Sequence, residues 1–222
     1  MHENLIYTLK QAETPPVLQR ENLIVNKYKE LSLEETEKLK LKNIIQVIES
    51  PSFAEAIEQG FITLAMIKPA ELNLPGLSDV ELAHAIKKAI QPPLEIIFEL
   101  SLIFDEKTIN EFYDGEPKRK QQELLPYVYK NKFQNRWEEF ANLMMSGPTT
   151  VLLLWSNKGD AVSFWRTQMG DWNVEERRNP NTIRGQFALN NYNGIVHGSD
   201  SIESVKREIN IMNNYLKLLF EN

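Results

Sequence analysis

The stretch from Asn193 to Ser201 (Asn-Gly-Ile-Val-His-Gly-Ser-Asp-Ser) sets one histidine, His197, between a short apolar run and a predicted helix start. A neutral imidazole has a free lone pair and a pKa near neutrality, so it can form a covalent phospho-intermediate. Gly198 lets the chain turn closely beside the ring, and a helix N-terminus favours anionic groups. A structural hydrogen bond is the alternative role for a histidine at a strand end.

The chain holds only three histidines, and the other two are weaker candidates for a nucleophile. His2 lies in a terminal segment, and His84 falls inside a predicted helix, where a surface or packing role is expected. His197 is therefore the candidate nucleophile.

Three cations accompany that nucleophile. Lys68 follows the first predicted strand, Arg166 lies in a predicted helix, and Arg184 precedes His197 by thirteen residues. Phosphoryl transfer depends on positioning and on neutralising the charge of the transferring oxygens. Arginine adds bidentate geometry that lysine lacks. One nucleophile and three cations together suit a triphosphate.

The elements that must position these residues alternate along the chain. Short apolar runs predict strands at 61–67, 94–104, 149–155 and 194–196, and amphipathic or capped segments predict helices at 78–90, 105–113, 159–169 and 201–219. A long polar loop is expected over 171–185, and Asp200 with Glu203 is expected to cap the last helix. This order predicts an α+β ferredoxin-like split βαβ sandwich, with one antiparallel four-stranded sheet and helices on one face.

Residues 1–58 form a predicted helical extension ahead of a main domain at 59–222. Ser32 and the spacing of Leu39, Ile44 and Ile48 favour a helix that Ser50-Pro51 interrupts and Gly60 ends. A packing arm or an oligomer contact is the expected role.

Composition excludes several functional classes. The net charge of −6 and the pI near 5.3 argue against general nucleic-acid binding, which needs a basic face. The absence of cysteine excludes disulfides, thiol nucleophiles and thiolate metal sites. Neither a signal peptide nor an apolar run of about 18 residues is visible, which predicts a soluble protein without membrane partners and, with the missing cysteines, a cytoplasmic one.

Several motifs then coincide in a known order. They are Thr-Leu-Ala-Met-Ile-Lys68-Pro, Glu111-Phe112-Tyr113, Ser146-Gly147-Pro148, Trp165-Arg166, Thr182-Ile183-Arg184-Gly185 and His197-Gly-Ser-Asp-Ser. In this order and spacing the chain resembles the nucleoside diphosphate kinases over about residues 61–213. The last third, with its thirteen-residue gap, is the most specific part.

The resemblance assigns roles by position. His197 matches the histidine that becomes phosphorylated, and Lys68, Arg166 and Arg184 match residues that hold the phosphates. Tyr113 matches a tyrosine beside them. Glu208 matches a carboxylate that steadies the imidazole, with Ser199 as its partner. The family carries Mg²⁺ on the nucleotide phosphates, with no metal cage built by the protein.

The sequence departs from the family pattern at two nucleotide contacts. Trp172 replaces a threonine that contacts phosphate, and Gly194 replaces an asparagine that contacts ribose; Asn193 and Asn191 are candidate substitutes. A hydrogen bond to a charged phosphate is worth roughly 1.5–3 kcal/mol.

An insertion at about 115–135 also separates Tyr113 from Gly147. It contains Phe133, the first candidate for the base-stacking phenylalanine, with Trp137 the second. The basic run at 118–120 is expected to be a solvated turn.

The predicted function is a nucleoside diphosphate kinase. A triphosphate would phosphorylate His197, and a diphosphate would then take the phosphate. The resemblance implies Mg²⁺, nucleoside triphosphates and diphosphates, and a homo-oligomer. The alternative is a nucleotide-binding regulatory or interaction module of the same fold with little or no turnover.

Overall fold

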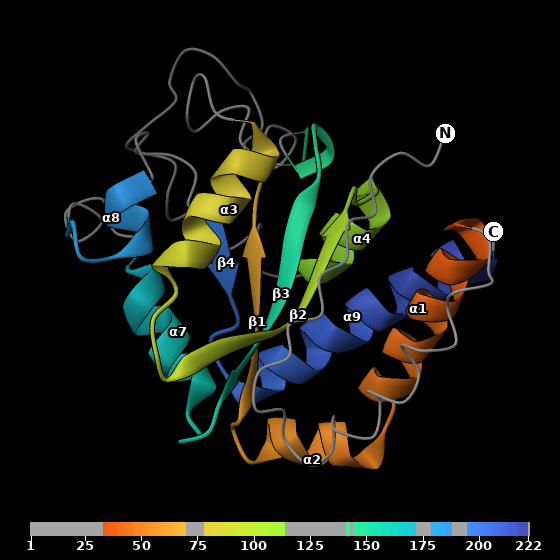
Figure 1. The fold of residues 1–222 in the computed structure, drawn as a ribbon, viewed down its shortest axis with the longest axis horizontal. Helices are drawn as coiled ribbons and strands as arrows, with labels where there is room; N and C mark the ends of the chain where they lie inside the picture. Colours follow the sequence, from red (N-terminus) through yellow and green to blue (C-terminus); the bar gives the residue numbers. More distant parts are fainter. Residues whose placement is uncertain are drawn as a thin grey trace.

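One four-stranded antiparallel sheet forms the centre of the computed structural model, which describes residues 33–69, 78–113, 141–142, 144–171, 179–187 and 195–221 (Figure 1). Its strands are β1 (Ile62–Ile67), β2 (Leu94–Leu102), β3 (Thr149–Ser156) and β4 (Val196–Gly198). They lie in the order β2-β3-β1-β4, and every neighbouring pair is antiparallel. This is the predicted split βαβ arrangement, because β3 inserts between β1 and β2.

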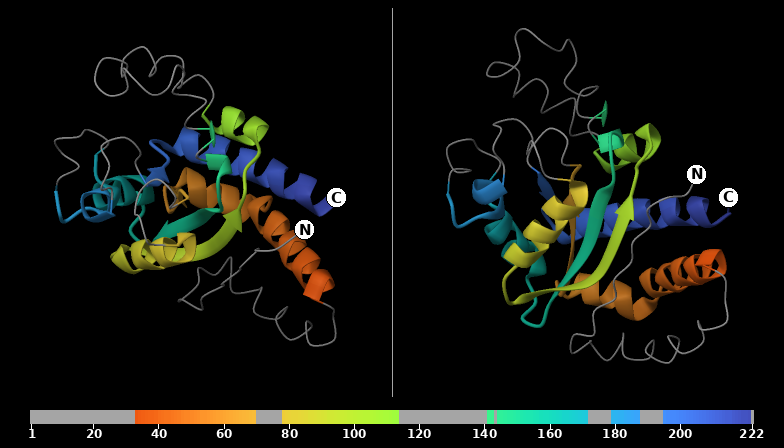
Figure 2. Two further views of the ribbon diagram at one scale, coloured as in Figure 1. Left: turned by 90° about the horizontal axis from the view of Figure 1, so that it is seen from above. Right: turned by 45° about the horizontal axis from the view of Figure 1, so that its top comes forward.

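Helices cover both faces of the sheet, so the expectation that they share one face is wrong (Figure 2). One face carries α3 (Asp79–Ala89), α7 (Ala161–Met169) and α8 (Ile183–Phe187). The other carries α1 (Leu33–Ile48), α2 (Pro51–Glu58), α4 (Glu106–Phe112) and α9 (Ile202–Glu221). The sequence of β1, which is apolar except for the buried Thr63, is the signal for this, since a strand that alternates would face water on one side.

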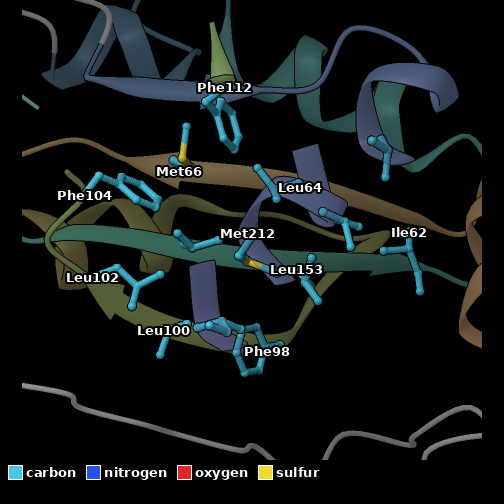
Figure 3. Close-up of a cluster of buried hydrophobic side chains, with 14 of the residues drawn as sticks. Ile62, Leu64, Met66, Phe98, Leu100, Leu102, Phe104, Phe112, Leu153 and Met212 are labelled. Carbon is cyan, nitrogen blue, oxygen red and sulfur yellow. The ribbon is translucent and has the colours of Figure 1, made fainter. Parts of the chain in front are cut away.

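The two cores meet across β1. Leu64 and Met66 point toward α9 and α4, whereas Ala65 and Ile67 point toward α3 and α7. Figure 3 shows the first cluster, where Leu64, Met66 and Leu153 of the sheet pack with Met212 of α9. All six residues of β1 are buried, so the strand that pairs with β4 is itself held in the core.

Local chemistry sets several helix ends as predicted. Ser78 and Glu81 form a capping box at the start of α3. The Asp105 side chain accepts from the Thr108 N–H at 2.7 Å and caps α4. Ser50 caps α2 with Pro51 at its first position, which explains the break after α1.

Three boundaries differ from prediction. The helix expected from residue 159 begins at Ala161, because Gly159 (φ 70°) and Asp160 (φ 52°) adopt left-handed turns. The expected loop at 171–185 includes the start of α8. The fourth strand covers 196–198 instead of 194–196, because β4 pairs with β1 from Val196 onward. His197 therefore lies within the strand and not at its end.

The last helix is capped by a different residue from the one expected. The Ser204 N–H donates to the Ser201 hydroxyl at 3.1 Å, so Ser201 is the capping side chain. Asp200 instead accepts from the Ser204 hydroxyl. The backbone N–H of Glu203 and the Ser201 hydroxyl lower the pKa of the Glu203 carboxyl.

Helices α1 and α2, here called the N-terminal arm (residues 33–58), pack along α9 (Figure 1). Leu41, Ile45, Phe53 and Ile57 are buried in the same cluster as the sheet. Ion pairs join Glu49 to Lys217 and Glu58 to Lys206. Helices α1 and α2 of the predicted extension thus pack into the core, while residues 1–32 lie outside the described residues. Within the described ranges, no helix is both long enough and apolar enough to span a bilayer.

Candidate active site

His197 is held at the edge of the sheet, where β4 pairs with β1. Met66 of β1 is its partner across the ladder, and neighbouring Ala65 pairs with Gly198. The His197 side chain is 19% exposed, so it lies near the surface without being open on every side. A strand fixes the backbone on both sides of the imidazole, which suits a group that must attack from one direction.

One ring nitrogen of His197 is engaged by a buried carboxylate. Its Nε2 lies 3.0 Å from Oε2 of Glu208, on α9, and the Glu208 side chain is only 4% exposed. The Ser199 hydroxyl donates to the same Oε2 at 2.7 Å. An ionised carboxylate accepts and cannot donate, so opposite an ionised Glu208 the proton of a neutral imidazole lies on Nε2 and the lone pair on Nδ1. The structure thus brings together three of the predicted catalytic residues.

Aromatic rings from the end of α4 line the imidazole. Phe112 and Tyr113 lie with ring centroids 5.4 Å and 5.6 Å from that of His197, at interplanar angles of 76° and 78°. Edge contacts of this kind restrict the tilt of the ring. Tyr113 was predicted at the site from the family pattern, whereas Phe112 was not assigned a role.

Trp165 explains why residue 198 is glycine. Its indole Nε1 donates to the His197 carbonyl at 3.1 Å, and the ring is fully buried. A Cβ added to Gly198 would lie 2.2 Å from that Nε1, closer than any side-chain carbon can approach. The glycine was expected to allow a turn; the structure shows that it allows α7 to contact β4.

Arg184 reaches β4 from α8. Its guanidinium donates to the Gly170 carbonyl at 2.8 Å and to the Val196 carbonyl at 3.1 Å. The side chain thereby ties the end of α7 to the residue before His197. In this state the two bonds go to backbone oxygens, and a phosphate contact stays a prediction.

Lys68 follows β1, and Arg166 lies on α7. The Lys68 N–H donates to the Ile195 carbonyl at 2.8 Å. Lys68 lies two residues after Met66, and Met66 is the partner of His197 in the ladder. Strand alternation directs Met66 and Lys68 to the same face. Arg166 is exposed on α7, next to Trp165. Their phosphate roles are untested predictions.

Three predicted nucleotide contacts fall outside the described residues: Phe133, Trp172 and Gly194. The insertion at 115–135 and the alternative candidates Trp137, Asn191 and Asn193 do so as well. Within the described part of the chain, no three His, Cys, Asp or Glu side chains are grouped to hold a metal ion.

One site residue was missed altogether. Arg207 donates to Oε1 of Glu208 at 3.2 Å and to the carbonyl of Phe112 at 2.8 Å. Adjacent residues on a helix do not face each other, so helical spacing does not predict a contact between Arg207 and Glu208. The only signal available was its position next to a predicted site carboxylate.

The fold and the histidine–carboxylate pair define a structural class of protein. It is a ferredoxin-like α+β sandwich with a histidine on an edge strand and a carboxylate from the last helix bound to that histidine. The family model described as "Nucleoside diphosphate kinase" matches residues 62–216. The chain therefore belongs to the nucleoside diphosphate kinase family.

Curated relatives agree with this assignment. "Nucleoside diphosphate kinase 6" of Danio rerio is 34% identical over 150 residues, covering 67% of this chain and 73% of that protein. A nucleoside diphosphate kinase of Histophilus somni is 45% identical over 149 residues, covering 66% and 88%. The crystal structure of the Aquifex aeolicus nucleoside diphosphate kinase superposes with a TM-score of 0.50 at 26% identity, covering 68% and 94%.

Proposed function

We propose that this protein is a working nucleoside diphosphate kinase whose phosphate carrier is His197. The observation that supports this most is the contact of Glu208 with Nε2 of His197, which leaves the lone pair on Nδ1. Family membership supplies the substrate class, nucleoside triphosphates and diphosphates.

The first half-reaction is a displacement at phosphorus. Nδ1 attacks the γ-phosphorus of the triphosphate, the bond from that phosphorus to the β–γ bridging oxygen breaks, and the diphosphate leaves with the electron pair. Nε2 keeps its proton, and the positive charge that develops on the ring is stabilised by the adjacent Glu208 carboxylate. Ser199 holds the same carboxylate oxygen in place.

The second half-reaction reverses the first with another nucleotide. A terminal oxygen of the incoming diphosphate attacks the phosphorus, and the P–N bond returns its electrons to Nδ1. Lys68, Arg166 and Arg184 are the proposed phosphate cations, which neutralise the spreading negative charge. Mg²⁺ enters with the nucleotide, chelated by its phosphates, as part of the substrate. We also assign Tyr113 to the nucleotide side of the ring.

Label transfer tests this proposal. Protein mixed with a triphosphate labelled at the γ-phosphate should acquire label on an acid-labile, base-stable bond, and a different diphosphate should release that label. His197→Ala should take up none. An unlabelled wild-type protein, or exchange retained by His197→Ala, would overturn the proposal.

A second function is favoured by two sequence departures, Trp172 and Gly194. With both nucleotide contacts changed, the chain would be a nucleotide-binding regulatory module with little turnover. Calorimetry would then show nucleotide binding, while exchange would be no faster than for His197→Ala. The described site supports the enzyme instead, because a binding module has no need of a buried carboxylate on Nε2.

Assembly and location follow the family as further proposals. We expect a homo-oligomer, to be tested by light scattering on the purified chain, and a cytoplasmic location, to be tested by fractionation. We propose that residues 1–58 form a helical extension and that residues 59–222 form the kinase domain.

A further inference from the structure

Beyond the residues expected from the family, one cation contacts the carboxylate behind the nucleophile. Both oxygens of Glu208 are engaged: Oε2 by Ser199 and His197, and Oε1 by Arg207. A buried carboxylate is stable only when its charge is compensated. Arg207 supplies that charge from the half-exposed surface, where its side chain is 44% exposed.

The same guanidinium also holds the end of α4. Its second nitrogen donates to the Phe112 carbonyl at 2.8 Å and lies 3.4 Å from that of Glu111. The last carbonyls of a helix lack partners within it and favour a nearby cation. No basic residue occurs in the last turn of α4 itself. Arg207 therefore provides from α9 the C-terminal cation that α4 lacks.

These two contacts join the two supports of the imidazole. Glu208 fixes the ring through Nε2, and Phe112 and Tyr113, at the end of α4, fix its tilt. Arg207 connects the carboxylate to the segment that presents the aromatic rings. The two contacts come from different nitrogens of one planar guanidinium, a spread of donors that the single nitrogen of an ammonium lacks.

We infer that Arg207 is a positioning residue for the phosphotransfer: by holding Glu208 to the end of α4, it keeps the Nδ1 lone pair of His197 aimed at the phosphorus. This rests on the proposed function. It assigns Arg207 no contact with the nucleotide.

The matched pair of variants is Arg207→Gln and Lys206→Gln. Each removes one positive charge from neighbouring positions of α9, but Lys206 pairs with Glu58 of the N-terminal arm and not with the site. In rapid-mixing experiments with labelled triphosphate, Arg207→Gln should slow phosphorylation of His197 by about tenfold to a hundredfold, as misplaced reacting groups do. Its nucleotide dissociation constant and the rate of Lys206→Gln should stay at wild-type values. Arg207→Lys should fall between, because an ammonium can make one of the two contacts.

A second measurement does not depend on turnover. Nitrogen-15 NMR of the histidine side chains should show His197 protonated on Nε2 in the wild-type protein and a mixture of tautomers in Arg207→Gln. If the tautomer and the phosphorylation rate are both unchanged in Arg207→Gln, or if Lys206→Gln slows the reaction equally, the inference is overturned. If the wild-type protein takes no phosphate, the proposed function fails, and the tautomer alone decides the role of Arg207.

Discussion

The family-matched region and the N-terminal arm divide the work of the molecule between them. Residues 62–216 carry every side chain assigned to the site, whereas the arm lies outside that match and contributes none. Yet Leu41, Ile45, Phe53 and Ile57 of the arm are buried with the residues of the sheet. Helix α9 belongs to both: Glu208 contacts His197, while α1 packs along the same helix. The residues assigned to the chemistry and many of those that stabilise the fold thus come from different parts of one core.

The largest expected effect comes from removing the arm. Deleting residues 1–58 exposes the apolar side of α9 and removes four buried side chains, each worth about 1.5–3 kcal/mol on full burial. That sum rivals the whole stability of a domain, about 5–15 kcal/mol. We expect the shortened chain to lack a cooperative thermal transition in calorimetry. An unchanged melting temperature would show that the arm is dispensable.

A single substitution in the arm should weaken the fold and spare the chemistry. Phe53 is 2% exposed, and Phe53→Ala should lower the free energy of unfolding by about 3–5 kcal/mol in urea titrations. Glu55→Ala, an exposed position of the same helix, is the control and should change it by less than about 0.5 kcal/mol. Phosphotransfer per folded molecule should equal wild type in both. A loss of transfer in folded Phe53→Ala would mean that the arm acts on the site.

Glu208→Gln should do the opposite, impairing chemistry in a protein that still folds. The amide keeps the shape of the side chain but removes the charge that stabilises the ring cation, so transfer should slow by about a hundredfold. Single-turnover kinetics with labelled triphosphate would measure this, with circular dichroism to confirm the fold. A rate within twofold of wild type, about 0.4 kcal/mol, would contradict the role given to Glu208.

Gly198→Ala should damage both properties together. The new methyl group would overlap the buried Trp165 ring, and overpacking of this kind costs about 1–3 kcal/mol. Since Trp165 also holds the His197 carbonyl, the transfer rate should fall along with the melting temperature. Wild-type values for both would mean that α7 and β4 are not in close contact at Gly198 and Trp165.

The smallest expected effect concerns Glu49, which lies between α1 and α2 of the arm. Its pKa lies below the ordinary 4.5, chiefly because of the hydrogen bond from Lys217, with a smaller one from Asn213. A lowered folded-state pKa stabilises the fold above the unfolded value, and the gain is lost as pH falls through the folded one. The melting temperature of Glu49→Gln should therefore be slightly lower than that of the wild type at pH 7 and equal to it in acid. Thermal melts across pH would measure this difference. A difference that persists in strong acid would exclude this ionisation as its cause.

The sequence predicted the element order because its signals were local. Ser78, Asp105 and Ser50-Pro51 define helix ends through side chains within three residues of the backbone groups they bind. His197 was predicted as the nucleophile from its place between an apolar run and a helix start, and Glu208 and Ser199 were predicted through the family resemblance. The structure brings the three within hydrogen-bonding distance.

What was missed depends on contacts between distant segments. The register of β4 follows from pairing with β1, 131 positions earlier at Met66 and His197, so no local pattern reveals that His197 lies inside the strand. The Arg207 contact joins α9 to α4 across 95 residues. Helices on both faces of the sheet, by contrast, were recoverable from the sequence of β1, which does not alternate between apolar and polar residues.

In the proposed mechanism, Glu208 holds Nε2 of His197 and leaves Nδ1 to take the phosphate. Nitrogen-15-labelled protein can be phosphorylated with a nucleoside triphosphate and the phosphorus located on the ring by NMR. We expect a bond to Nδ1 of His197, with the proton retained on Nε2. Phosphate on Nε2, on another residue, or nowhere on the protein would exclude this mechanism.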